Sequence, residues 1–96
     1  MHSLAVYHRD IKLDNLIYEP DSQVLKIIDF GFAVTSKERL KSPVGTPSFM
    51  APELTLRKEY MGEKVDIWAT GVVMYALLTG ALPFAGSGES SLFRRI

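Results

Sequence analysis

The chain has 96 residues and a mass of 10.7 kDa, with eleven basic and eleven acidic side chains and no cysteine. The balanced charge argues against a nucleic-acid partner attracted by bulk charge, and the lack of cysteine excludes disulfides, Cys-ligated zinc and cysteine nucleophiles. The contents of 47% hydrophobic and 23% charged residues are typical of a globular protein.

The first third of the chain is predicted to hold one small β-hairpin. Residues 2–7 are too short to form an element of their own, and residues 8–15 have the character of a loop rich in reactive side chains. Leu16–Glu19 and Val24–Ile28 are strand candidates because they are apolar or β-branched. Pro20–Ser22 between them is a turn signal, so we expect the two strands to pair.

The rest of the chain is predicted to be a long loop followed by helices. Residues 35–48 are polar and interrupted by proline and glycine, which indicates a loop. Residues 53–56 form a short helix candidate. Apolar side chains cover most of the circumference of a helix over residues 64–79, so we expect that helix to be buried. Residues 90–96 begin another helix.

An uncharged stretch over residues 67–88 raises the alternative of a membrane helix. Only Val72–Leu78 is densely apolar, and glycines and a proline interrupt the remainder, so we expect no membrane span. Residues 1–7 lack the basic start and apolar core of a signal peptide, which favours a cytoplasmic location.

Three short motifs and a fourth match occur in order along the chain. His8–Asn15 reads H-R-D-I-K-L-D-N, Asp29–Gly31 reads D-F-G after the second strand, and Ala51–Glu53 reads A-P-E. Asp66–Gly71 follows as D-I-W-A-T-G. Taken singly, each motif fits ordinary turns, caps or solvated side chains, but their order around a predicted hairpin is specific. The chain resembles the eukaryotic-type serine/threonine protein kinases.

The resemblance implies an α+β fold, the central part of the mainly helical C-terminal lobe of a kinase with a small β-hairpin, truncated at both ends. It implies one partial domain over 1–96, with the catalytic loop at 8–15, the activation segment at 29–53 and the buried helix at about 64–79. Residues around 49–53 and 82–84 resemble the calcium/calmodulin-dependent and AMP-activated groups. No glycine-rich phosphate loop occurs, so we expect a missing N-terminal lobe to complete the site and the isolated chain to be inactive.

The resemblance also assigns the catalytic and cofactor residues. Asp10 would accept or orient the proton of the attacking hydroxyl, and Lys12 would place a positive charge near the γ-phosphate of ATP. Asn15 and Asp29 carry the hard oxygen atoms that suit Mg²⁺. Ile17 matches the apolar position beneath the adenine ring. ATP and Mg²⁺ are therefore the cofactors expected of the full-length parent.

Substrate choice and regulation follow from the same resemblance. Thr46 matches the threonine that packs beside the catalytic aspartate in serine/threonine kinases. Lys12 and Thr46 both favour a serine or threonine acceptor in a protein substrate. Asp14 suits substrates with basic residues upstream of the target, or is a solvated carboxylate. Arg9 is predicted to bind a phosphate that an upstream kinase places on Ser42. The alternative is that Ser42 is an ordinary loop serine with no regulatory role.

The remaining motif residues are assigned structural roles. Asp66 would accept hydrogen bonds from the backbone of the His8–Arg9 segment, and Phe30 would pack beside a catalytic aspartate. Glu53 would pair with an arginine much later in the domain. The residues given structural roles are His8, Phe30, Gly31, Glu53 and Asp66.

One alternative is a non-catalytic interaction module that keeps the substrate-docking lobe of a kinase. Such a module would tolerate loss of Asp10 and Asp29 but not disruption of the long helix. The presence of Asp10, Lys12, Asn15 and Asp29 together favours the enzyme, because a scaffold has no use for the complete set.

Overall fold

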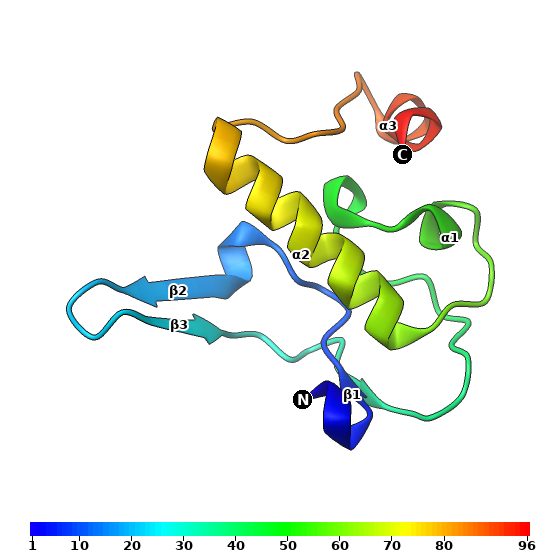
Figure 1. Cartoon of the computed structure of the whole chain (residues 1–96). Coiled ribbons are helices and arrows are strands. Elements are labelled where there is room, and N and C mark those ends of the chain that lie inside the picture. The colour runs from blue at the N-terminus through cyan, green and yellow to red at the C-terminus, as the bar shows by residue number, and fades with distance from the viewer.

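The computed structural model describes all residues 1–96. Its strands and helices, in chain order, are β1 (Val6–Tyr7), β2 (Leu16–Glu19), β3 (Val24–Ile27), β4 (Val34–Thr35), α1 (Pro52–Thr55), α2 (Gly62–Thr79) and α3 (Glu89–Arg95). Helix α2 crosses the centre of the molecule, with the β2–β3 hairpin projecting to one side and α1 lying on the other (Figure 1). The predicted α+β character is confirmed.

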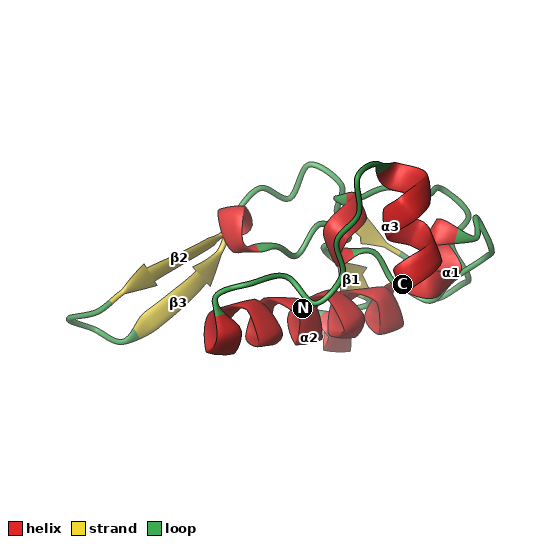
Figure 2. Cartoon of the chain, turned by 90° about the horizontal axis from the view of Figure 1, so that it is seen from above, coloured by secondary structure: helices red, strands yellow, loops and turns green.

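The β2–β3 hairpin forms as predicted, with antiparallel pairs from Leu16 opposite Ile27 to Glu19 opposite Val24. The turn over residues 20–23 closes it, and β3 ends at Ile27, one residue earlier than predicted. All residues of β3 are exposed. Seen from above, the hairpin extends away from the helices (Figure 2), so its own strand pairing is what holds it together.

A second, smaller ladder corrects the expectation that residues 2–7 form no element. His2–Leu4 is a 3-10 turn, and β1 pairs with β4 through Val6 opposite Thr35 and Tyr7 opposite Val34. Two-residue strands carry no local pattern, and the partner lies far along the chain. The pairing is therefore a tertiary contact that local sequence does not reveal.

Helix α2 is buried on one side only, which corrects the prediction of a helix buried all round. It begins two residues before the predicted start, at Gly62, and its buried positions are Gly62, Val65, Asp66, Ala69, Val72, Val73 and Ala76. The opposite face leaves Leu77 and Leu78 71% and 80% exposed. No helix is long and apolar enough to cross a bilayer.

Two small apolar clusters join the loops to α2. One contains Ala51, Leu54, Tyr60 and Val65, and the other contains Ile11, Ala69 and Val73. Glycine is required at the start of α2, because a Cβ at Gly62 would lie 2.4 Å from the ring of Tyr7. The close approach of β1 to α2 sets the position of the loop that follows Tyr7.

Candidate active site

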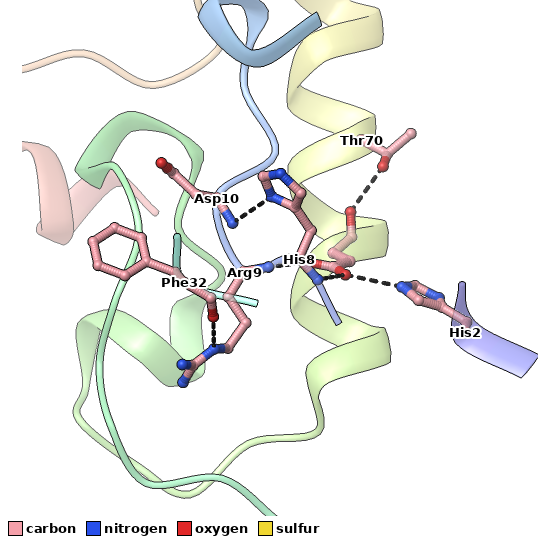
Figure 3. Close-up of polar contacts among 7 residues, drawn as sticks. His2, His8, Arg9, Asp10, Phe32 and Thr70 are labelled. Carbon is pink, nitrogen blue, oxygen red and sulfur yellow. Dashed lines mark hydrogen bonds and ion pairs between the residues drawn. The ribbon is translucent and has the colours of Figure 1, made fainter. Parts of the chain in front are cut away.

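Asp66 of α2 anchors the loop that begins at His8. Its carboxylate is nearly inaccessible, and its two oxygens accept hydrogen bonds from the backbone N–H groups of His8 and Arg9, both at 2.9 Å. The His2 ring nitrogen Nε2 lies 2.9 Å from Oδ2 (Figure 3). The predicted contact between Asp66 and this backbone is present. It holds Arg9 in the left-handed region, at φ 66°, which is a strained conformation for a long side chain.

His8 connects the loop that contains Asp10 to the end of the hairpin. The side chain is completely buried; Nδ1 accepts a hydrogen bond from the backbone N–H of Asp10 at 3.1 Å, as Figure 3 shows. Nε2 lies 2.9 Å from the carbonyl oxygen of Ile28. Because the backbone N–H can only donate, Nε2 carries the proton and donates to Ile28. One ring therefore sets the distance between Asp10 and the strand that leads to Asp29.

The carboxylate of Asp10 receives contacts from three predicted site residues. The Thr46 hydroxyl donates to Oδ1 at 2.8 Å, and the Asn15 side-chain amide donates to the Asp10 carbonyl at 2.8 Å and to Oδ2 at 3.3 Å. Lys12 Nζ lies 4.0 Å from Oδ2. The structure thus brings Asp10, Lys12, Asn15 and Thr46 together, although Thr46 is remote in sequence.

Asp29 follows the hairpin, two residues after β3 ends at Ile27. The backbone N–H of Ile28 donates to the Asn15 carbonyl at 2.9 Å, which places the next residue, Asp29, close to Asn15. Asp29 is exposed, has φ 59°, and accepts a hydrogen bond from the Gly31 N–H at 3.2 Å. The Asp29 carboxylate is therefore hydrogen-bonded within its own D-F-G turn, to the backbone two residues later.

The side chains of Asn15 and Asp29 carry oxygen atoms of the kind that Mg²⁺ prefers. No group of three or more His, Cys, Asp or Glu side chains is placed to hold a metal. Asp29 and Asn15 together supply one carboxylate and one amide oxygen. Mg²⁺ in phosphate sites commonly takes one or two such ligands and completes its shell with water and phosphate oxygens.

The Arg9 guanidinium contacts two distant loops through neutral acceptors. Nε donates to the carbonyl of Phe32 at 2.7 Å, and Nη1 donates to the hydroxyl of Tyr60 at 3.0 Å. The Tyr60 hydroxyl in turn donates to the carbonyl of Ser42. No carboxylate lies within ion-pair distance of the Arg9 guanidinium. Sequence reasoning missed Tyr60, because a tyrosine in a loop gives no local sign of partners so distant in the chain.

The other predicted residues have varied surroundings. Ile17 and Asp14 are exposed, on β2 and in the turn before it. Glu53 is partly buried on α1 and forms no ion pair with this chain. Phe30 is half exposed, and its ring meets the His8 ring edge-on with the centroids 4.8 Å apart. The phenyl ring therefore contacts the residue that orients the backbone of Asp10.

Comparisons with known proteins agree with this geometry. The sequence model of the protein kinase domain matches residues 1–96. The chain is 49% identical to CBL-interacting protein kinase 25 of Oryza sativa subsp. japonica, across 99% of the chain and 19% of that protein. It is 46% identical to the probable serine/threonine-protein kinase MARK-A of Dictyostelium discoideum, across 99% of the chain and 9% of the relative.

A third relative is serine/threonine-protein kinase SRK2G of Arabidopsis thaliana, 43% identical across 98% of the chain and 28% of the relative. The chain therefore spans less than a third of the length of each of these three proteins. It belongs to the protein kinase domain family, among relatives named as serine/threonine kinases.

Proposed function

We propose that these residues form the catalytic part of the C-terminal lobe of a serine/threonine protein kinase. The natural-length protein would transfer the γ-phosphoryl group of ATP to a serine or threonine hydroxyl of a protein substrate. The observation that carries the proposal is the Asp10 carboxylate, one oxygen of which accepts a hydrogen bond from Thr46 while the other lies near Lys12 and Asn15.

The two oxygens of Asp10 have different tasks in this proposal. Oδ1 accepts the Thr46 hydroxyl, and Oδ2, which lies near Lys12 and accepts the longer hydrogen bond from Asn15, is proposed to face the substrate hydroxyl. The hydroxyl oxygen forms a bond to the γ-phosphorus as the bond to the bridging oxygen of ADP breaks, and its proton passes to Oδ2. The ammonium group of Lys12 stabilises the charge on the transferred phosphoryl oxygens.

The nucleotide side of the site is proposed to use the hairpin and its two ends. Bound Mg²⁺ would neutralise phosphate charge and link the nucleotide to the protein. Asn15 and Asp29 offer it oxygen ligands, and Ile17 offers an apolar surface to the adenine ring. A separate N-terminal lobe, supplied by residues outside these 96, would close over the phosphates.

Regulation is proposed to act through Ser42. Its side chain is exposed and its hydroxyl forms no hydrogen bond, so an upstream kinase can reach it. The Arg9 guanidinium, which has no carboxylate partner, is joined to the Ser42 backbone through Tyr60. A phosphate on Ser42 would supply the anion that Arg9 lacks.

Substrate preference is the least constrained part of the proposal. The exposed carboxylate of Asp14 is available to basic residues upstream of the acceptor. The resemblance of residues 49–53 and 82–84 to the calcium/calmodulin-dependent and AMP-activated groups supports placing the chain near those groups.

The test uses the natural-length protein, Mg-ATP and three peptides that differ only in a serine, threonine or tyrosine acceptor. We expect transfer to serine and threonine, and transfer reduced by at least about 100-fold in Asp29→Asn but unchanged in the control Asp21→Asn, which alters an exposed turn. Binding of the peptides without transfer would favour the interaction module, and equal activity in the two variants would contradict the role of Asp29.

A further inference from the structure

Tyr60 combines almost complete burial with a hydroxyl that has two distant partners. Only 1% of the residue is exposed, and its ring lies in the apolar cluster with Ala51, Leu54 and Val65. The hydroxyl accepts a hydrogen bond from Arg9 and donates one to the carbonyl of Ser42. Both its donor and acceptor capacities are used, so the hydroxyl has a single preferred orientation.

The backbone of Tyr60 reinforces this link. Its N–H donates to the Leu40 carbonyl at 2.9 Å, and its carbonyl accepts from the Leu40 N–H at 2.8 Å. With the bond to Ser42, three hydrogen bonds therefore fix residues 40–42 of the activation segment to one buried residue. Any movement of Ser42 that stretches its bond to Tyr60 acts directly on the hydroxyl.

The other end of the link reaches the catalytic loop. The Arg9 guanidinium is oriented by two neutral acceptors, the carbonyl of Phe32 and the hydroxyl of Tyr60. The Arg9 backbone is fixed by Asp66, and the next residue is Asp10. Ser42, Tyr60, Arg9 and Asp10 thus form one connected path, separate from the direct contact of Thr46 with Asp10.

We propose that the Tyr60 hydroxyl is a positioning group that transmits the phosphorylation state of Ser42 to Arg9 and the catalytic loop. The inference rests on the proposed kinase function and adds to it the route by which the regulatory residue affects catalysis. Tyr60 touches neither substrate nor nucleotide in this account. Its effect is on how strongly a phosphate on Ser42 changes the turnover rate.

The experiment uses three forms of the natural-length protein: wild type, Tyr60→Phe and the control Tyr75→Phe. Each is prepared once with serine and once with site-specifically incorporated phosphoserine at position 42, and kcat is compared between the two. The control removes the same atom from a partly exposed tyrosine whose hydroxyl makes no hydrogen bond. We expect the phosphate to raise kcat by the same factor in wild type and Tyr75→Phe. In Tyr60→Phe that factor should fall by at least about threefold, with the KM for ATP unchanged within about twofold.

An equal activation factor in all three proteins would overturn the inference. A wild-type kcat that does not change on phosphorylation of Ser42 would also overturn it. So would a kcat that Tyr60→Phe lowers by the same factor with and without the phosphate, because a purely structural role of Tyr60 predicts that result. Failure of the kinase proposal shows separately, as a wild-type protein that binds the peptides but transfers no phosphate with either serine or phosphoserine at position 42.

A second readout does not depend on activity. Arg39 and Lys41 are exposed tryptic sites beside the anchored segment. We expect trypsin to cleave after them at least about threefold faster in Tyr60→Phe than in Tyr75→Phe, because one anchor is lost. Equal rates would count against the link. If Tyr60→Phe does not fold, 3,5-difluorotyrosine at position 60 keeps the ring and weakens the hydroxyl as an acceptor; an unchanged activation factor would then overturn the inference.

Discussion

The catalytic side and the nucleotide side of the candidate site are held in place in different ways. On the proposed catalytic side, the Asp66 carboxylate accepts hydrogen bonds from the backbone of His8 and Arg9, and the Thr46 hydroxyl donates one to Asp10. Both side chains come from distant parts of the chain. On the proposed nucleotide side, Ile17 lies on a hairpin with exposed residues along both strands, held mainly by its own ladder, and Asp29 follows that hairpin (Figure 2). Substitutions should therefore affect the geometry of catalysis on one side and contacts to the nucleotide on the other.

The largest expected effect is loss of the anchor on the catalytic side. Asp66→Asn replaces a buried carboxylate that accepts two backbone hydrogen bonds and contacts His2. We expect the free energy of unfolding to fall by about 3 kcal/mol, because buried donors lose a charged acceptor. Urea denaturation of the natural-length protein measures this. Asp21→Asn in the hairpin turn should change stability by less than about 0.5 kcal/mol, and equal losses would refute the contrast.

The next effect concerns the contact between the activation segment and Asp10. Thr46→Val keeps the shape of the side chain but removes the donor to Oδ1. We expect kcat to fall about tenfold, since a hydrogen bond to a charged group is lost. Thr46→Ser keeps the hydroxyl and should stay within about twofold of wild type. A serine variant as slow as the valine variant would show that the methyl group, not the hydrogen bond, matters.

A smaller effect is expected on the nucleotide side. Ile17→Ala should raise the KM for ATP about fivefold through lost apolar contact with adenine, while thermal stability stays almost unchanged because Ile17 is 50% exposed. Leu25→Ala is the control, on the same hairpin but on the opposite face by strand alternation. Equal effects on the KM in both variants would mean that the hairpin acts as a whole and that Ile17 has no special contact.

The smallest effect has the opposite sign. Gly71 lies in the interior of α2, and a Cβ there would have no atom within 4 Å. Gly71→Ala should therefore stabilise the protein by about 0.5–1 kcal/mol, since alanine restricts the unfolded chain and favours helix. Gly62→Ala in the same helix should destabilise it, because its Cβ would clash with Tyr7. Calorimetric melting curves distinguish the two signs.

Much of the fold follows from local sequence. The hairpin, α1, α2 and α3 lie within two residues of their predicted bounds at the points where turn residues or apolar periodicity mark them. The contacts of Asp66 with the His8–Arg9 backbone and of Thr46 with Asp10 were expected from family resemblance, and both are present. No spacing rule alone would have placed Thr46 beside Asp10.

The features that sequence did not reveal all depend on distant partners. The β1–β4 ladder joins segments too short to show a period, and Tyr60 gains its two hydroxyl partners only when three loops meet. The exposed face of α2 also carries large apolar side chains, among them Ile67, Leu77 and Leu78, so the sequence predicted burial on both faces. Phe30 follows the turn at Asp29 and meets His8, a contact set by backbone conformation rather than by residue type.

The most direct measurement is the rate of phosphoryl transfer to a serine peptide by the natural-length protein and its Asp10→Asn variant, with melting temperatures measured alongside. The substitution keeps the size of the side chain and removes the proton acceptor. We expect kcat to fall at least about 100-fold with little change in melting temperature. A folded Asp10→Asn protein that transfers phosphate at the wild-type rate would contradict it.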